Sequence, residues 1–537
     1  MPAIDHVVVL MLENRSFDHM LGFLDHPDPA FDGLLRGGPY TNPGWQGAAP
    51  VAASAGAKAV LPVDPDHSHD AVMRQLGLAP TPPYGAATNQ GFVTDFERGG
   101  RGLVLPRFTG LFGPLVNWWV RYRAAAGTPV VGRGPLAMLC QAPERVPVLS
   151  RLALDFAVCT RWFCPVPGET WPNRNFAHAA TSDGETDIDV RFYPNPTIFE
   201  LLEAHGRDWR VYHDDTPQVW AFPRLWDTPA RHANWFPFAR FAEHCAAGTL
   251  PAYSFIEPNH QPPMHTLDHA PIVGRPDVSD SQHPGNNLVT DAAYDDFDDA
   301  ADTDFARGET LIASVYESLR AQPDLFARTL LVITYDEHGG LYDHVAPPRG
   351  VPAPGKPSRG ASFAHLFLEE TSAAFDFSML GPRVPAVVVS PLIAAGTVDA
   401  TVRDHAAIPA TLRALFAPNA EPLTARDAWA PPVHDLLTLD EPRTADLPDL
   451  SAYATPEAGG EGPAAEITAD LAALPSKVPE YYRDFLRQAE LVWNHLARLD
   501  EPETAGSLEA SEPRRATQIT GAFVAAAQRH RSGDAPQ

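Results

Sequence analysis

The chain has 537 residues, a length that suits one large α/β core with insertions or two or more domains. Hydrophobic residues make up 44% of it, which is ample for a buried core, and the formal net charge of −27 disfavours nucleic acid and anionic membranes as general partners. The four cysteines are too few and too irregularly spaced for a disulfide framework or a zinc site, so we expect buried free thiols.

The N-terminal segment predicts a buried strand that ends in a polar turn. Residues 7–12 are all apolar, a pattern typical of a parallel strand covered on both faces, and Glu13 and Asn14 follow directly. Because this strand begins close to Met1, with no basic segment or cleavage site before it, we expect a cytoplasmic protein, or a secreted one if a signal segment has been removed. No run of residues has the length and apolar character of a transmembrane helix.

Residues 97–135 predict an insertion into the main domain. Its apolar run includes Phe112, Trp118 and Trp119, which could form a lid or an interfacial segment. The alternative is an insertion that packs on the body of the protein, with these rings buried.

Residues 166–174 predict a turn, punctuated by Pro and Gly, that carries a candidate nucleophile. The hydroxyl of Thr170 on this turn can attack a substrate if a metal lowers its pKa. The alternative is that Thr170 only caps a helix.

Helices and strands alternate through the rest of the chain. We expect helices at 198–205, 308–321 and 405–416, and strands at 209–212, 253–256, 330–333 and 384–390. A helix followed by a parallel strand is typical of βαβ units. The acidic run 291–304 predicts a solvated loop, with a second calcium site as the alternative. Beyond it we expect a linker at 436–465, a helical segment at 466–500, and a disordered or loosely helical tail at 501–537.

A second polar pair follows a buried strand late in the chain. Asp336 and Glu337 come just after the apolar run 330–333, as Glu13 and Asn14 come after the first strand. In open α/β sheets, ligands bind beyond the carboxyl ends of such strands, so both pairs are expected at one edge of the sheet. Hard oxygen ligands suit Ca, Mg or Mn. The sequence therefore predicts one divalent metal ion, whose identity stays open.

Several motifs in unbroken order over about residues 4–430 carry a resemblance to a known family. They are 13–19 (Glu-Asn-Arg-Ser-Phe-Asp-His), 66–68, 89–93, 161–163, 170–174 (Thr-Trp-Pro-Asn-Arg), 255–257, 281–284, 334–344, 380–385, 390–391, 404–405, 408–411 and 426–429. The chain resembles the phosphoesterase family of bacterial phospholipases C and related acid phosphatases, closest to the plant-type non-specific phospholipase C branch. The resemblance implies an alkaline-phosphatase-like three-layer α/β sandwich with a mostly parallel central sheet, in a catalytic domain at 1–435.

The resemblance also implies roles for individual residues. One metal is expected to be surrounded by Glu13, Asn14, Thr170, Asp336 and Glu337. The expected catalytic residues are Thr170, His67 and His283, since a histidine can protonate a leaving alkoxide near neutral pH. Possible substrate contacts are Asn173, Arg174 and His260, although Asn173 and Arg174 could instead fix the nucleophile turn. Structural roles are expected for His69, His338 and His344, and for Asp18 and His19, which would close the turn after Asn14.

The function that this combination predicts is metal-dependent hydrolysis of phosphoric esters. The first expectation is a phospholipase C-type phosphodiesterase acting through a phosphothreonine at Thr170, and the alternative is an acid phosphatase-type phosphomonoesterase. An alternative of another class is a non-catalytic phospholipid or head-group binding protein. We expect a phosphate-ester substrate, no nucleic acid partner and at most transient contact with a membrane surface. Head-group preference and oligomeric state stay open.

Overall fold

The computed structural model describes most of the chain up to residue 454. The described residues are 4–79, 82–98, 132–214, 216–226, 228–260, 279–288, 294–295, 303–355, 375–454, 488 and 491–492. The predicted lid residues Phe112, Trp118 and Trp119 and the tail 501–537 lie outside the described residues. So do most of the acidic run and most of the segment 466–500.

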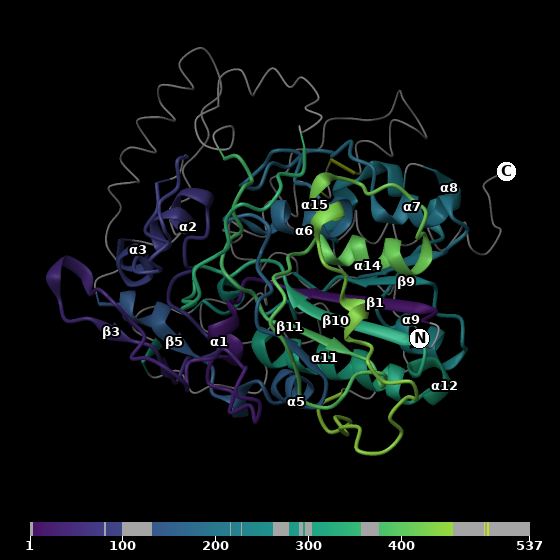
Figure 1. Ribbon diagram of the computed structural model, residues 1–537, viewed down its shortest axis with the longest axis horizontal. Coiled ribbons are helices and arrows are strands. Elements are labelled where there is room, and N and C mark those ends of the chain that lie inside the picture. The colour runs from purple at the N-terminus through teal and green to yellow at the C-terminus, as the bar shows by residue number, and fades with distance from the viewer. Residues whose placement is uncertain are drawn as a thin grey trace, which may run out of the picture.

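Eight strands of the described chain form one central sheet, in the order β12-β6-β11-β10-β1-β9-β7-β8 (Figure 1). Their bounds are β1 His6–Leu12, β6 Ala157–Cys159, β7 Trp209–Tyr212, β8 Trp235–Phe236, β9 Tyr253–Ile256, β10 Thr329–Tyr335, β11 Ala386–Val389 and β12 Thr397–Asp399. β1 pairs in parallel with β10 on one side and with β9 on the other, whereas β11 runs antiparallel to both of its neighbours. The predicted α/β fold with a mostly parallel sheet is confirmed.

Helices cover both faces of the sheet, which explains why β1 and β10 are apolar along almost their whole length. In Figure 1 one layer lies above the strands and the other below them. The upper layer contains α6 (Thr170–Ala179), α7 (Ile198–Ala204), α14 (Ala407–Phe416) and α15 (Ala425–Trp429). The lower layer contains α5 (Pro147–Asp155), α11 (Asp304–Arg320) and α12 (Pro323–Phe326), and α9 (Arg240–Ala246) contacts α11. None of the helices that the structure describes is long and apolar enough to cross a membrane.

A smaller group of elements lies beyond the carboxyl end of β1 (Figure 1). It comprises α1 (Phe17–Leu21), α2 (His69–Gln75), α3 (Phe92–Arg98) and the short strands β2 (Thr41–Asn42), β3 (Val51–Ala52), β4 (Ser54–Ala55) and β5 (Leu139–Cys140). The helix α8 (Pro229–His232) lies elsewhere, near α7. All four cysteines are buried and free, as predicted. The edge of the sheet that faces α2 and α3 is therefore the place to look for the predicted site.

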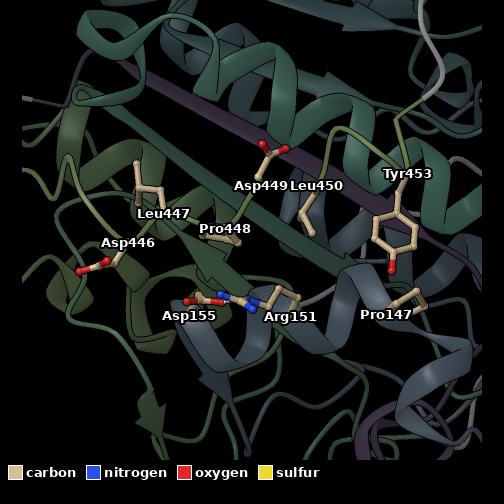
Figure 2. A pocket seen from close by; sticks show the side chains of 9 residues that line it. All are labelled: Pro147, Arg151, Asp155, Asp446, Leu447, Pro448, Asp449, Leu450 and Tyr453. Carbon is tan, nitrogen blue, oxygen red and sulfur yellow. Dashed lines mark hydrogen bonds and ion pairs between the residues drawn. The ribbon is translucent and has the colours of Figure 1, made fainter.

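The segment that follows α15 packs against the body of the protein as far as residue 454. Leu436, Leu437 and Leu450, all within the predicted linker, are buried in the main core. The hydroxyl of Tyr316 in α11 donates to the carbonyl of Pro448 at 3.0 Å. A hollow of about 480 Å³ lies between this segment and α5 (Figure 2). No predicted site residue lines it, so the predicted chemistry belongs to the strand ends.

Candidate active site

The turn after β1 presents Glu13 and Asn14 in a fixed orientation. The N–H of Glu13 donates to the carbonyl of Ser281 at 2.9 Å. Asn14 has a φ of +56°, a left-handed conformation that asparagine tolerates better than most residues and that ends the strand. The hydroxyl of Ser16 then caps α1 by accepting from the N–H of His19 at 3.1 Å. Both Glu13 and Asn14 are buried.

The turn after β10 lies directly beside this first turn. The register places Leu12 opposite Tyr335, so the residues that follow the two strands leave the sheet side by side. The carboxylate of Asp336 accepts from the N–H of Asn14 at 2.9 Å and from the N–H of Glu337 at 2.7 Å. The two predicted ligand pairs are thus joined by a hydrogen bond from the backbone of Asn14 to the side chain of Asp336.

Gly339 allows the two turns to approach so closely. Its φ is +66°, and a Cβ atom placed on it would lie 2.0 Å from the carbonyl oxygen of Asn14. We expect Gly339→Ala to destabilise the protein by at least about 1–3 kcal/mol and to lower activity sharply, because the turn must move away from Asn14. Urea unfolding and kcat/KM measure the two effects.

Gly206 provides a matched control for this substitution. Its φ is +71°, but a Cβ atom on it would meet nothing within 4 Å, so Gly206→Ala carries the backbone strain without the collision. An equal loss of stability and activity in both variants would mean that the close approach of the two turns has no special role.

Thr170 is the first residue of α6 and points at the same site. Glu169 occupies the N-cap position, so Thr170 is not the capping residue of the alternative interpretation. Its hydroxyl donates to Oδ1 of Asn14 at 3.3 Å. The partial positive charge at the start of this ten-residue helix favours negative charge on the Thr170 oxygen. Asn173 holds the turn by donating to the carbonyls of Gly168 at 3.1 Å and Glu169 at 3.0 Å.

Two histidines flank Asn14 on its other side. Nδ2 of Asn14 lies 3.3 Å from Nε2 of His67 and 3.0 Å from Nε2 of His283. Nδ1 of His67 donates to the carbonyl of Pro65 at 2.7 Å, which leaves its Nε2 as an acceptor in the neutral ring. Nδ1 of His283 instead accepts from the N–H of Gly285 at 2.9 Å, so the neutral ring carries its proton on Nε2. Both rings therefore present Nε2 to the site, as an acceptor in neutral His67 and as an N–H group in neutral His283.

His283 is neutral because it is buried, and His67 lies close to a carboxylate. Burial lowers the pKa of His283 to about 4, so this ring is neutral near pH 7. Nε2 of His67 lies 4.0 Å from Oε1 of Glu337. Asp64 was not predicted, yet it shares a cluster with both rings in which one ligand atom of each residue lies within 4.8 Å of the others. The loop position of Asp64, two residues before the motif 66–68, gave no pattern from which to find it.

The predicted ligand carboxylates are crowded and fully buried. Burial raises the pKa of Asp336 to about 8 against the effect of Arg174, and Glu13 and Glu337 add to the rise. Burial likewise raises the pKa of Glu337 to about 7. Burial would also raise the pKa of Glu13, but the charge and hydrogen bond of His260, together with the charges of His283 and Arg174, outweigh it, and the pKa falls to about 2. The raised pKa values of Asp336 and Glu337 mean that the described positive groups do not fully stabilise the charged forms of these two carboxylates.

Two carboxylate oxygens of the predicted ligands are suitably placed to bind a cation. Oε1 of Glu13 and Oε1 of Glu337 are buried and accept no hydrogen bond from the described residues. An unsatisfied buried carboxylate oxygen is costly, and a hard divalent ion is the partner that such oxygens prefer. The donor set of carboxylate, amide and hydroxyl oxygens therefore suits the predicted metal.

Arg174 and His260, predicted as possible substrate contacts, are directed at carboxylates of the protein. Nε of Arg174 donates to Asp336 at 2.9 Å and Nη1 donates to Glu257 at 3.1 Å. Nδ1 of His260 lies 2.9 Å from Oε2 of Glu13. Burial would raise the pKa of Glu257, but Arg174 and then His260 lower it to about 2. The motif 255–257 indicated no role for Glu257, although this residue too directly follows a buried strand.

A separate ion-pair network joins the first and last motifs behind the site. Arg383 donates to Asp18 at 2.8 Å and to Asp343 at 2.9 Å, and Nδ1 of His344 lies 2.7 Å from Asp18. Asp18, Asp343 and His344 are close enough to form a metal cluster, but Arg383 already binds both carboxylates. We therefore assign this cluster to support of the turns rather than to a metal.

His344 makes the stability of this network dependent on pH. Burial lowers its pKa, but hydrogen bonds to Asp18 and Asp32 outweigh burial and raise the pKa to about 9. Since the ordinary value is 6.5, the contribution is fully present below pH 6.5 and is lost as the pH rises through 9. We expect His344→Gln to cost on the order of 1–3 kcal/mol at pH 6.5 and little at high pH.

Urea unfolding of wild type and His344→Gln across this pH range measures the effect. His205, an exposed histidine, is the matched control, and His205→Gln should follow the wild-type curve. A loss in His344→Gln that is the same at all pH values would contradict the role given to its charge.

The other predicted structural histidines have contacts within the protein. Nδ1 of His69 lies 2.6 Å from the carbonyl of Pro167, and Nε2 of His338 lies 2.8 Å from Oε1 of Gln75. Nδ1 of His19 lies 3.0 Å from the carbonyl of Leu139. These contacts tie the turns after β1 and β10, and the nucleophile turn, to α2 and β5.

Comparison with known proteins places this chain in a family. The model of the Phosphoesterase family matches residues 4–417. The chain belongs to this family. Like other phosphoesterases it is a hydrolase of phosphoric esters, as predicted. The matched range ends after α14, so it includes every residue of the candidate site.

Individual relatives of this phosphoesterase are phospholipases C. It is 32% identical to Non-specific phospholipase C3 of Arabidopsis thaliana over 467 residues, which cover 83% of this chain and 76% of that protein. Non-specific phospholipase C6 of the same plant is 33% identical over 454 residues, covering 82% and 73%. Non-hemolytic phospholipase C of Burkholderia pseudomallei is 27% identical over 501 residues, covering 84% and 62%. The predicted family resemblance is confirmed.

Solved structures show only a distant likeness to the phosphoesterase. A phosphonate monoester hydrolase from Silicibacter pomeroyi gives a TM-score of 0.30 at 12% identity, covering 56% of this chain and 73% of that one. A protein of the alkaline phosphatase superfamily from Vibrio parahaemolyticus gives 0.28 at 10% identity, covering 52% and 62%.

Proposed function

We propose that this phosphoesterase is a metal-dependent phosphodiesterase of the phospholipase C type that acts through a phosphothreonine at Thr170. The observation that carries the proposal is the hydroxyl of Thr170, held at the start of α6 and bonded to Asn14 within the cluster of buried carboxylates. Similarity to the non-specific phospholipases C of Arabidopsis thaliana supports a phospholipid as the substrate.

The residues that would hold the metal are Glu13, Asn14, Thr170, Asp336 and Glu337. A divalent ion, when bound, lowers the pKa of a hydroxyl that it contacts and neutralises charge on phosphoryl oxygens. The unsatisfied oxygens of Glu13 and Glu337 support this assignment. The ion could be Ca, Mg or Mn, since all three accept such a donor set.

The chain's own groups can then perform two displacements in turn. The hydroxyl of Thr170 releases its proton to solvent as its oxygen attacks phosphorus, and the bond from phosphorus to the diacylglycerol oxygen breaks. The departing oxygen takes a proton from His67, which must first be protonated at Nε2, 4.0 Å from the carboxylate of Glu337, and which regains that proton from solvent. Water next attacks the phosphorus bound to Thr170, releases the phosphorylated head group and restores the hydroxyl.

The other polar groups act on the phosphoryl oxygens and on the nucleophile. The neutral ring of His283 can donate its Nε2 proton to a phosphoryl oxygen without changing its own charge. Asn14 orients the hydroxyl of Thr170. Asn173 keeps the turn from opening when charge develops on the Thr170 oxygen. Together these groups stabilise the charge distribution of the transition state.

A substrate panel tests the proposal. Purified protein would be assayed with phosphatidylcholine, p-nitrophenyl phosphorylcholine and p-nitrophenyl phosphate, each with added divalent metal and with excess chelator. We expect the two diesters to be hydrolysed faster than the monoester, and all activity to be lost with chelator. Preference for the monoester would support the acid phosphatase alternative. Binding of phosphatidylcholine vesicles without turnover of any substrate would support the non-catalytic binder instead.

A further inference from the structure

Glu257 is a buried carboxylate at the site. Neither metal binding nor substrate contact explains its presence there. It directly follows β9, which lies beside β1 in the sheet, so it leaves the sheet at the same edge as Glu13. Its side chain is buried, with only 2% of the residue exposed. A buried charge needs partners, and the identity of those partners indicates what it does.

Among the described residues, Glu257 has three hydrogen-bond or ion-pair partners, two of which have side chains that are cationic or can become so. Oε2 accepts from Nη1 of Arg174 at 3.1 Å. Oε1 lies 3.3 Å from Nε2 of His260 and accepts from the backbone N–H of Gln218 at 2.6 Å. Both carboxylate oxygens are thus engaged by the protein, which distinguishes Glu257 from Glu13 and Glu337.

Each of the two side-chain partners, Arg174 and His260, also contacts a predicted metal ligand. Nε of Arg174 donates to Oδ2 of Asp336 at 2.9 Å. Nδ1 of His260 lies 2.9 Å from Oε2 of Glu13. Arg174 also donates to the carbonyl of Met11 at 2.9 Å, so it is fixed to the end of strand β1, just before Glu13. The carboxylate that follows β9 is therefore connected, through Arg174 and His260, to ligands that follow β1 and β10.

We propose that Glu257 is a positioning residue that orients two metal ligands, Asp336 through Arg174 and Glu13 through His260. The inference rests on the proposed metal-dependent function and adds to it the group that sets the ligand geometry. Removal of a residue that hydrogen-bonds to a metal ligand typically lowers metal affinity by about 10–100-fold. Without the carboxylate, Arg174 and His260 lose a shared anchor, and both ligands lose their fixed orientation.

The support for Glu257 extends to the C-terminal segment. Gln218, whose N–H donates to Glu257, accepts at its carbonyl a hydrogen bond from Nε2 of Gln488 at 2.8 Å. Gln488 is buried, and Val492 nearby in the sequence belongs to the main core. Gln488→Ala therefore perturbs the same carboxylate from outside, without changing a charge or a residue of the site.

Metal titration of the full-length protein tests the inference. After removal of bound metal, Ca²⁺, Mg²⁺ and Mn²⁺ alone would each be titrated by calorimetry into wild type, Glu257→Gln and Glu309→Gln. Glu309 is the matched control, because it is a buried glutamate that accepts from the backbone N–H groups of Val148 and Leu149 and, among the described residues, bonds to no predicted metal ligand. We expect Glu257→Gln to raise the Kd of the tightest-binding ion by about 10–100-fold and Glu309→Gln to leave it unchanged.

The outcomes separate this inference from the proposed function. Wild-type affinity in a folded Glu257→Gln, or equal weakening in Glu309→Gln, would overturn the positioning role and leave the proposed function standing. Wild-type protein that binds none of the three ions would overturn both. If Glu257→Gln fails to fold, Gln488→Ala decides the matter: a smaller rise in Kd supports the role of Glu257, and an unchanged Kd overturns it.

Discussion

Thr170→Ala is expected to lower kcat by on the order of 10⁴–10⁶-fold while the protein stays folded. The substitution removes only a hydroxyl and a methyl group at the start of α6, and Glu169 rather than Thr170 holds the cap position. The helix should therefore form as before. What is lost is the oxygen that attacks phosphorus, and no other hydroxyl donates to Asn14 among the described residues. Steady-state kinetics and circular dichroism measure the two sides of this prediction.

Thr411 offers a matched control for Thr170. It is a buried threonine within α14, and its hydroxyl donates to the carbonyl of Ala407, away from the predicted ligands. Thr411→Ala should keep most of the wild-type kcat. Wild-type turnover in Thr170→Ala would show that a water molecule attacks phosphorus directly and that Thr170 has a structural role.

Glu337→Gln is expected to reduce kcat/KM by on the order of 10²–10³-fold and to weaken metal binding. Oε1 of Glu337 is the buried oxygen without a hydrogen-bond donor, so an amide there removes both a ligand and a negative charge. Excess metal should restore part of the activity. Full activity of the variant at low metal concentration would remove Glu337 from the metal site.

The same substitution should raise the stability of the metal-free protein. The pKa of Glu337 is raised to about 7, above its ordinary value of 4.5. Ionisation of this group in the folded, metal-free protein is therefore unfavourable, and stability is lost as the pH rises through about 7. Glu337→Gln cannot ionise, so its Tm without metal should exceed that of the wild type above this pH. A lower Tm would indicate that Glu337 is stabilised by a partner other than a metal.

The strand ends could be predicted because local sequence determines them. Residues 7–12 and 330–333 are continuous apolar runs, and such a run is compatible with a strand covered on both faces. Polar residues that follow two such strands must emerge at the same edge when the strands are parallel neighbours. Glu13 and Asp336 are brought together by this rule. The direction of β11 could not be predicted in the same way, because an apolar run has no direction of its own.

The partners of the buried side chains depend on contacts that are distant in the sequence. Arg174 has the chemistry of a phosphate ligand, and nothing near it in the chain indicates that Glu257 and Asp336 already bind it. The different tautomers of His67 and His283 likewise follow from Pro65 and Gly285, whose backbone groups are positioned by the tertiary fold. Sequence motifs thus indicate which residues gather, and the three-dimensional contacts indicate what each of them does.

Trapping of the covalent intermediate tests the central claim most directly. Wild-type protein would be mixed with p-nitrophenyl phosphorylcholine in the presence of metal, quenched in acid at a series of early times, digested and analysed by mass spectrometry. We predict that the peptide containing Thr170 carries the phosphorylcholine group on the threonine oxygen, and that neither Thr170→Ala nor chelator-treated protein shows this adduct. Product formation with the adduct on a different residue, or with Thr170 unmodified at every quench time, would contradict a mechanism through phosphothreonine.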